Sequence, residues 1–313
     1  MKNKIKRLAW LIPLTASIVI GYFVFLGQNF LRICEDTSAL LFGSATMLIL
    51  FLIIFLLTVV KSSKSNFKLM FGIEVLLLFC YGLFFNLAIR PFNHYFTVTA
   101  RQDSIQNVLL PSIDCGKKIF TAYESYCQNR LNLYDAKLTS AISNERLAPS
   151  DLDSLGFNDT IPLERQADNK RFILENQLKS DLYESLKKSS VEWLENAADN
   201  LKKWKAIGVV QSYCVLQDEI EKYKSELVSY SLFSQKNEGA TVFTYDCVDS
   251  NANELFCRKD KITIQSYVLL SVLFSLGLLI YFFEPRDFRN TNLFLKIISR
   301  RKSREDDDTD VRL

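Results

Sequence analysis

The stretch ALLFGSATMLILFLIIFLLTVV, residues 39–60, runs through 22 positions without a charged side chain. A helix needs roughly 20 apolar residues to cross the ~30 Å hydrocarbon core of a bilayer. Backbone amides in that core must find hydrogen-bond partners within the protein, so an isolated apolar run of this length folds as a helix. Residues 39–60 therefore predict a transmembrane helix and point to the fold class of the whole chain.

Three more runs of similar length and composition flank this one. They are LAWLIPLTASIVIGYFVFL (8–26), LMFGIEVLLLFCYGLFFNLAI (69–89) and ITIQSYVLLSVLFSLGLLIYFF (262–283). The first run is bulky near its end and has no small-x-small cleavage site, which favours an uncleaved anchor over a signal peptide. The sequence thus predicts an all-α membrane protein with four transmembrane helices.

The apolar runs divide the chain into four parts. Residues 1–89 would hold three transmembrane helices, and residues 90–261 would form a large, mostly helical domain. The fourth helix at 262–283 would precede a tail, 284–313, that is first basic and then acidic.

Basic residues predict the side of the membrane on which each segment lies. Lys and Arg number four before the first run, one before the second, three before the third and eight in the tail. The positive-inside rule then places both termini in the cytoplasm and residues 90–261 on the periplasmic or extracellular side of the plasma (inner) membrane. Arg258, Lys259 and Lys261 are basic on the predicted outer side, but long domains are exported regardless of such charges.

Charge also bears on the partners of the protein. The insert 90–261 carries 22 basic and 25 acidic residues, with no dense basic stripe. A nucleic-acid-binding domain would show such a stripe, so nucleic acid is not expected as a partner. The basic cytoplasmic segments suit the anionic lipid of the inner leaflet.

Six of the seven cysteines fall outside the cytoplasm in this topology. They are Cys34, Cys115, Cys127, Cys214, Cys247 and Cys257. An even number in an oxidising compartment favours three disulfides, and free buried thiols are the alternative. Cys247 and Cys257 form the most local pair. Cys115 and Cys127 would lie ~18 Å apart on a straight helix, too far for a bridge. A bond from Cys34 to the insert would tie the first loop to it.

Helical periodicity dominates the insert. Residues 171–207 place apolar side chains on one face of a single long helix. These are Leu174, Leu178, Leu182, Leu186, Trp193, Ala197, Leu201 and Trp204. Trp193 and Trp204 are candidates for a partner surface, with the core of the domain as the alternative. The segment GATVFTYDCVDSN, residues 239–251, has the composition of a short strand or hairpin.

Motifs that carry chemistry are absent from the sequence. The sequence has no G-x-S-x-G, H-E-x-x-H or Walker loop. It also has no C-x-x-C pair and a single histidine, His94, so we expect no metal site and no cofactor. Glu74 is the ionisable group inside a predicted span. A carboxylate within the bilayer is energetically costly, so its presence in a span favours a functional role. Near the inner surface it could also pair or reach the headgroups.

The tail adds a further candidate contact. LFLKIISRRKSR, residues 293–304, combines apolar and basic residues, which suits the inner leaflet or a cytoplasmic partner. Arg300, Arg301 and Lys302 are the candidate interaction residues of this segment.

The layout of a short first outer loop and a large cysteine-bearing second one resembles that of tetraspanins. The large loop of that family carries Cys-Cys-Gly, whereas DCGKK at 114–118 has one cysteine, so the likeness covers the layout alone. The four apolar runs and the basic tail after Phe283 also resemble the TssN inner-membrane family of Bacteroidetes type VI secretion systems. That resemblance implies a polytopic component of a secretion system.

Taken together, the residues predict a non-enzymatic, multi-pass membrane scaffold or anchor. It would belong to an oligomer or larger complex with other envelope proteins. The alternative is a sensor or transport protein, gated through the outer domain, with Glu74 as the intramembrane acidic group.

Overall fold

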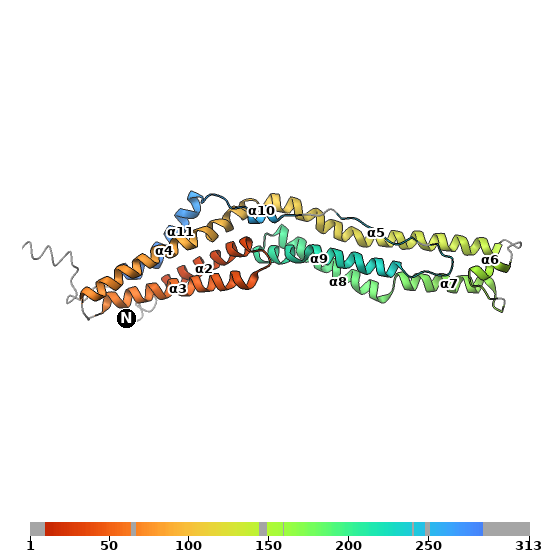
Figure 1. Cartoon of the computed structure of the whole chain (residues 1–313), viewed down its shortest axis with the longest axis horizontal. Helices are drawn as coiled ribbons and strands as arrows, with labels where there is room; N and C mark the ends of the chain where they lie inside the picture. Colours follow the sequence, from red (N-terminus) through yellow and green to blue (C-terminus); the bar gives the residue numbers. More distant parts are fainter. Residues whose placement is uncertain are drawn as a thin grey trace, which may run out of the picture. The chain divides into compact units, whose positions relative to one another are not determined.

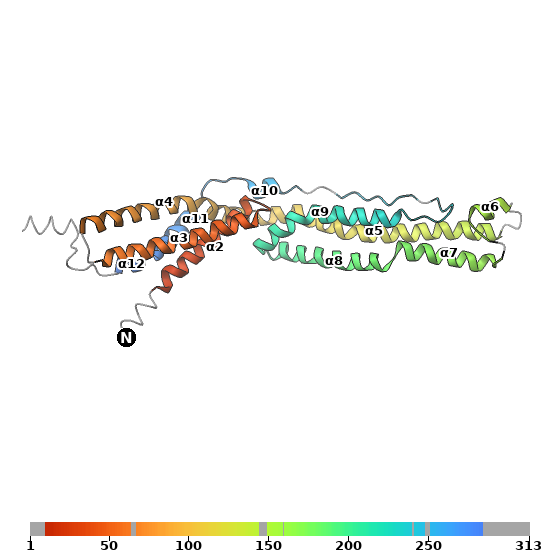
Figure 2. The same ribbon diagram turned by 60° about the horizontal axis from the view of Figure 1, so that its bottom comes forward.

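A computed structural model describes the chain over residues 10–63, 67–143, 149–158, 160–239, 241–247 and 251–283. Every regular element within these ranges is an α-helix. The chain divides into two compact units. Unit 1 consists of Met1–Ala100 and Phe256–Leu313, and unit 2 consists of Arg101–Leu255. Figure 1 and Figure 2 label the helices of both units.

The long helices of unit 1 correspond to the first three apolar runs of the sequence. They are α2 (Leu11–Leu31), α3 (Asp36–Ser62) and α4 (Phe67–Ala100). Each is long and apolar enough to cross a membrane, as predicted. Helix α4 continues beyond the predicted end at residue 89, because Pro91 lies within it without ending it. Unit 2 consequently begins at Arg101, eleven positions later than the domain predicted from the sequence.

The fourth apolar run is divided between two helices. They are α11 (Ile264–Gly277) and α12 (Leu279–Phe283), and Leu278 separates them. The backbone N–H of Leu278 still donates to the Phe274 carbonyl at 3.2 Å, and its φ and ψ remain helical. With 14 residues, α11 by itself is shorter than a spanning helix. Within the described residues, the structure thus shows three candidate spans and one shorter apolar helix of 10–17 residues.

The surface and interior of unit 1 have the polarity of a membrane protein. Leu41, Leu48 and Phe79 are each more than 60% exposed. The buried side chains include polar ones, namely Ser17, Asn29, Thr46, Thr58, Glu74, Asn93, His94 and Thr97. Water favours the opposite distribution, whereas lipid favours apolar side chains outside and polar groups paired inside.

Glycines bring the helices of unit 1 close together. A Cβ added to Gly27 of α2 would lie 1.7 Å from the Pro91 carbonyl oxygen of α4. A Cβ added to Gly43 of α3 would lie 2.5 Å from Cβ of Phe25 on α2. Small residues let membrane helices make close van der Waals contact, which drives their association in lipid. Helix α2 therefore packs tightly against both α3 and α4.

Helix α5 (Gln102–Ser143) is the central element of unit 2, and it packs against three other long helices. These are α7 (Leu163–Leu178), α8 (Asp181–Lys202) and α9 (Ala206–Ser231). Two short helices are also present, α6 (Pro149–Ser154) and α10 (Asn253–Cys257). The helical character predicted for this domain is confirmed.

Aromatic side chains of α5 form the centre of the unit 2 core. The ring centroid of Tyr123 lies 5.2 Å from that of Tyr183 on α8 and 5.2 Å from that of Phe243. The Tyr123 hydroxyl donates to the Leu178 carbonyl at 3.1 Å. This bond is the partner that a buried phenol requires, and it joins α5 to the end of α7.

The prediction of one continuous helix over residues 171–207 is wrong. Helix α7 ends at Leu178, and Ser180 caps a new helix by accepting a hydrogen bond from the Tyr183 backbone N–H at 3.4 Å. The interruption shifts the buried face, so Tyr183 is buried and Leu182 is 69% exposed. A serine side chain competes well for helix N-termini, which explains the interruption.

The segment after α9 runs back along α5 in an irregular, extended form (Figure 2). We call its residues 241–247 the strap. The Tyr126 hydroxyl donates to the Thr241 carbonyl at 2.5 Å, and Phe243 packs on Tyr123. The expected strand or hairpin is not present in these described residues, because the strap contacts helix side chains rather than a second extended segment.

Candidate functional site

Glu74 on α4 lies in a small polar cluster inside unit 1. It is 4% exposed, and the Tyr281 hydroxyl on α12 donates to its Oε1 at 2.5 Å. Lys61 near the end of α3 donates from Nζ to the Tyr281 carbonyl at 2.5 Å. The same ammonium lies 4.7 Å from the centroid of the Tyr281 ring. Residues of three helices therefore meet at Tyr281, next to the buried Glu74.

This geometry gives the carboxylate a structural role that the sequence did not reveal. A polar group inside an apolar bundle needs a partner, and Tyr281 supplies one. Because Tyr281 belongs to α12, the pair holds the last part of the fourth apolar run against α3 and α4. The sequence pattern singled out Glu74, but its partner lies 207 positions away and had no local signal.

A second connection holds α11 to α4. The Tyr81 hydroxyl donates to the Phe274 carbonyl at 2.8 Å, and the two rings lie 4.9 Å apart. Together with the Glu74 cluster, this contact gives the broken fourth run two polar attachments to α4.

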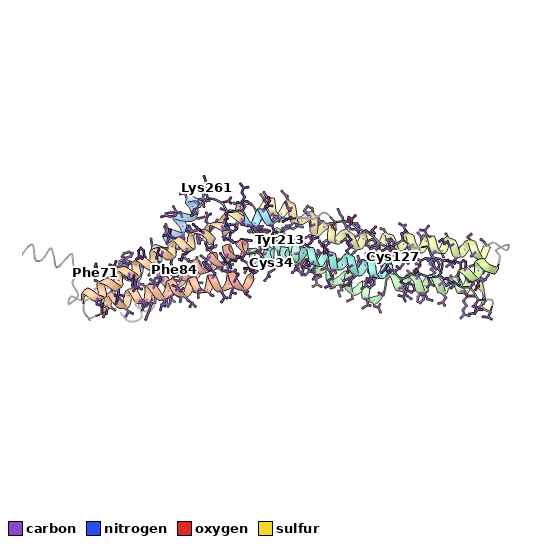
Figure 3. All side chains as sticks on the ribbon, in the orientation of Figure 1. Cys34, Phe71, Phe84, Cys127, Tyr213 and Lys261 are labelled. Carbon is purple, nitrogen blue, oxygen red and sulfur yellow. A yellow bond between two sulfur atoms is a disulfide. The ribbon has the colours of Figure 1, made fainter. Side chains whose placement is uncertain are left out.

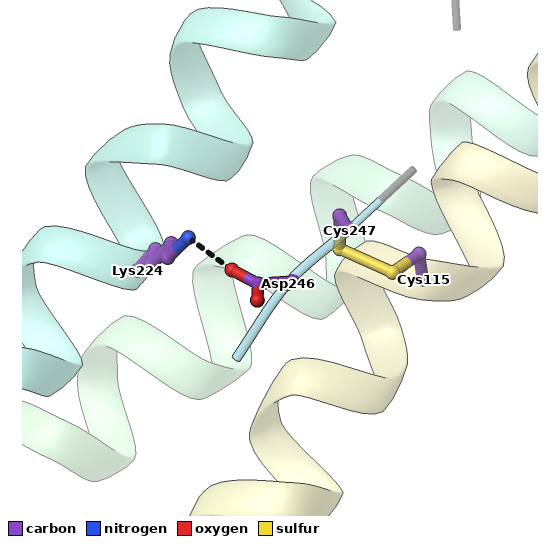
Figure 4. Close-up of a disulfide and its surroundings, with 4 residues drawn as sticks. All are labelled: Cys115, Lys224, Asp246 and Cys247. Atoms are coloured by element: carbon purple, nitrogen blue, oxygen red, sulfur yellow. Dashed lines mark hydrogen bonds and ion pairs between the residues drawn. A yellow bond between two sulfur atoms is a disulfide. The ribbon is translucent and has the colours of Figure 1, made fainter. Parts of the chain in front are cut away.

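Cys115 on α5 forms a disulfide with Cys247 at the end of the strap (Figure 4). The two Cα atoms are 5.9 Å apart, within the usual range for a disulfide. The adjacent Asp246 pairs with Lys224 of α9 at 3.2 Å. The strap is thus attached to two helices of unit 2. Cys34 and Cys214 are disulfide-bonded as well.

The expectation of three disulfides is wrong for two of the six cysteines. Cys127 and Cys257 are free thiols, so Cys247 does not pair with its local neighbour Cys257. Cys127, labelled in Figure 3, lies on α5 and is buried, and burial raises the pKa of its thiol to about 11. Cys127 is therefore a core residue, the free buried thiol that the sequence analysis left open as the alternative.

Arg130 on α5 and Glu238 form a buried ion pair in unit 2. Their side chains are 4% and 1% exposed. The guanidinium donates through Nε and Nη2 to the carboxylate, and through Nη1 to the Ser231 carbonyl at 2.6 Å. Glu238 also accepts from the Gln235 backbone N–H at 2.9 Å. Burial alone would lower the pKa of Arg130, but the hydrogen bonds and charge of Glu238 outweigh it, so the pKa is raised.

The tryptophans proposed as interaction residues occupy different settings. Trp193 lies within α8 and Trp204 just after its end, and both are half-buried. Trp204 has φ +48° and completes the end of α8, where its N–H donates to the Leu201 carbonyl at 3.1 Å. Glycine usually occupies this position of a helix end, so the indole is held there against a local backbone preference.

The remaining candidates are His94 and three residues of the tail. His94 is buried on α4. Within the described residues, no three His, Cys, Asp or Glu side chains gather as a metal site would require. Arg300, Arg301 and Lys302 lie outside the residues that the structure describes.

Comparison with protein-family models, with curated proteins and with solved structures gives no significant match.

Proposed function

We propose that this chain is a non-enzymatic, multi-pass scaffold or anchor of a cell-envelope assembly, of the kind found in secretion systems. Helices α2, α3 and α4 and the α11–α12 pair would cross the inner membrane four times. The termini would face the cytoplasm and unit 2 the periplasm or cell exterior. Unit 2 would then be the part that meets other envelope proteins.

The disulfide between Cys115 and Cys247 is the observation that carries the proposal. Disulfides form and persist in oxidising compartments and are rare in the cytosol. Unit 2 carries this bond, while unit 1 carries the apolar surface. A chain with both features suits a membrane anchor with an exported, covalently braced domain.

The surface of unit 2 offers apolar side chains to a partner. Four leucine or phenylalanine residues are each more than 60% exposed, namely Leu133, Phe172, Leu182 and Leu232. The aromatic core and the Arg130–Glu238 pair are buried, so they hold the unit together and leave the exposed positions for contacts. A scaffold needs such a stable body with accessible anchor residues.

Photo-crosslinking in cells tests the partner proposal. A photoreactive phenylalanine at Phe172 or Leu182 should give discrete higher-mass adducts. The same residue at Lys202, an exposed polar position on α8, is the matched control. Adducts at the apolar positions but not at the control support a scaffold. A protein that gives no adducts and purifies in mild detergent as a lone monomer contradicts it.

The predicted topology has its own test in Cys257. Of the free cysteines, Cys257 is exposed, Cys127 is buried and Cys80, in α4, is partly buried. A membrane-impermeant maleimide should therefore label intact spheroplasts of the wild type and spare the Cys257→Ser variant. Labelling that requires lysis of the cells would place this segment in the cytoplasm and reverse the assigned orientation.

The burial of Glu74 supports a second candidate function, that of a gated sensor or transporter. A carboxylate among membrane helices is a common coupling group, and the Tyr281 hydroxyl would have to release it during a cycle. Glu74→Gln separates the two proposals. A scaffold keeps its assembly when the bond to Tyr281 is retained through the amide, whereas a proton- or ion-coupled cycle stops.

A further inference from the structure

A pocket in unit 1 lies at the end of the apolar helix α2 and just before the start of the apolar helix α11. It has a volume of about 390 Å³. Its walls come from the end of α2, from α4 and from the segment before α11, and they consist of Leu31, Arg90, Asn93, His94, Lys259, Asp260, Lys261 and Ile262. We call it the basic pocket. It contains two of the three basic residues whose positions conflict with the positive-inside pattern of the sequence.

The segment that supplies the lysines is fixed to α4 by one buried side chain. Asn93 is 3% exposed. Its Oδ1 accepts from the Thr263 backbone N–H at 2.8 Å and from the Thr263 hydroxyl at 3.0 Å, and its Nδ2 donates to the Lys261 carbonyl at 3.4 Å. Thr263 in turn caps α11 by accepting from the Ser266 N–H. Lys261, labelled in Figure 3, is therefore held at a defined position beside α4.

The lining has an excess of positive charge. Arg90, Lys259 and Lys261 contribute three cations, and Asp260 contributes one anion. The Asp260 carboxylate lies 3.7 Å from the Arg258 guanidinium outside the lining. None of the three lining cations forms an ion pair with another described residue. Their charges are thus available to an anion that enters the pocket.

The position of the pocket and its apolar walls indicate which kind of anion would bind there. The pocket adjoins residue 89, where the third apolar run ends, and Ile264, where α11 begins. Leu31 and Ile262 add apolar surface, and Ile262 is 47% exposed. A ligand that suits both features has an anionic phosphate next to hydrocarbon. Basic pockets between membrane helices on the cytoplasmic side are known to take such headgroups, and we extend the same chemistry to this pocket, which lies on the outer side in the proposed topology.

We propose that the basic pocket binds the phosphate group of an anionic phospholipid. Arg90 and Lys261 contact the phosphate oxygens, Lys259 adds charge at the entrance, and the acyl chains lie along Leu31 and Ile262. The proposal rests on the assignment of α11 to the membrane, which is part of the proposed function. It does not depend on the partner of unit 2.

Native mass spectrometry of the purified full-length chain tests the proposal. Phosphatidylglycerol should bind more tightly than phosphatidylcholine. Arg90→Gln/Lys261→Gln should weaken phosphatidylglycerol binding about tenfold or more, because each basic residue near a lipid surface contributes appreciably. Lys202→Gln/Lys222→Gln removes the same charge from exposed positions of unit 2 and should leave it unchanged. Asp260→Asn removes the lining anion and should tighten binding, a gain that misfolding cannot mimic.

The outcomes separate the proposals. Equal affinity for the two lipids, or unchanged phosphatidylglycerol binding by the Arg90→Gln/Lys261→Gln variant, overturns the lipid site. Displacement of the lipid by a comparable concentration of inorganic phosphate overturns the choice of a lipid and identifies a soluble phosphate site. A chain that fails to insert into vesicles contradicts the proposed membrane topology. A chain that inserts but does not distinguish the two lipids contradicts the basic pocket alone.

Discussion

Arg130 and Glu238, 108 positions apart in the sequence, form the most deeply buried ion pair described in unit 2. Five N–H groups of a guanidinium need acceptors when they leave water, and here the carboxylate is joined by the Ser231 and Phe233 carbonyls. The pair therefore fixes the turn after α9 against α5. Loss of one partner should destabilise the fold strongly, because the other charge would stay buried without a compensating interaction.

Replacing one partner of this pair should destabilise unit 2 strongly. We expect Arg130→Met to lower the free energy of unfolding by about 3–5 kcal/mol, because Glu238 is left buried without its counter-charge. The double variant Arg130→Met/Glu238→Leu should recover part of the loss. Guanidinium denaturation followed by the fluorescence of Trp193 and Trp204 measures both.

Lys222→Met serves as the control for this experiment. Lys222 pairs with Glu219 on the surface of α9 at 3.7 Å, with the lysine side chain 58% exposed. An exposed pair contributes about 1 kcal/mol at most. Equal losses from Arg130→Met and Lys222→Met would show that the buried pair has no special weight.

The close contact between α2 and α4 leads to a second prediction. Gly27→Ala places a methyl group against the Pro91 carbonyl, and the backbone cannot yield without moving a helix. Overpacking of this kind costs about 1–3 kcal/mol. The thermal midpoint of the purified protein in detergent should fall. Gly82→Ala on α4 is the matched control, since its Cβ would meet nothing within 4 Å, and it should leave the midpoint unchanged or raise it slightly.

The cysteines predict an ordered pattern of alkylation. In native, unreduced protein, Cys257 should react first because it is exposed and free. Cys127 should react only after denaturation, because it is buried and its raised pKa of about 11 keeps the thiol protonated at neutral pH. Cys115 and Cys247 should need reductant as well. Mass spectrometry of peptides labelled in successive steps checks the order, and early labelling of Cys115 would contradict the disulfide.

Glu124 on α5 predicts a modest dependence of stability on pH. A hydrogen bond from Lys187 is the main cause that lowers the pKa of Glu124, and the Tyr183 hydroxyl, at 3.2 Å, also donates to it. A carboxyl whose pKa is lower in the folded state stabilises the fold above its ordinary pKa. That contribution is lost as the pH falls through the lowered pKa. Because Glu124 is 38% exposed, the effect should be about 1 kcal/mol or less.

Comparing the free energy of unfolding of the wild type with that of Glu124→Gln over a range of pH measures the contribution of the Glu124 charge. The variant should be the less stable protein near neutral pH, and the difference should shrink as the carboxyl of the wild type becomes protonated in acid. A difference that stays constant with pH would assign the effect to packing rather than to charge.

The sequence predicted the three described helices that are long and apolar enough to cross a membrane, because apolar runs of about 20 residues have one physical solution in lipid. The fourth run was predicted as one helix and is divided into α11 and α12. Tyr123, Cys127 and Tyr134 of α5 also follow helical spacing, and all three are buried. The break between α7 and α8 was missed because the apolar residues of 171–207 keep their helical spacing across it. Ser180 was the available signal, as a residue that favours helix N-termini over helix interiors.

Long-range pairs could not be predicted from local pattern. Glu74 was recognisable as a costly residue, but Tyr281 and Lys61 are ordinary residues whose contact depends on the three-dimensional path of the chain. Arg130 and Glu238 each look like surface residues of a polar domain. The cysteines could be paired in about 15 ways if all six were bonded, and spacing favoured the local pair that does not form.

The strap has a consequence for the order in which the protein is made. Cys247 comes 132 positions after Cys115, so the covalent staple cannot close until nearly the whole of unit 2 has left the ribosome. Until then, nothing seals the Tyr123 edge of α5 from the side that Phe243 later covers. A nascent chain stalled before residue 241 would present this edge to chaperones, and formation of the Cys115–Cys247 bond would be among the last steps of its maturation.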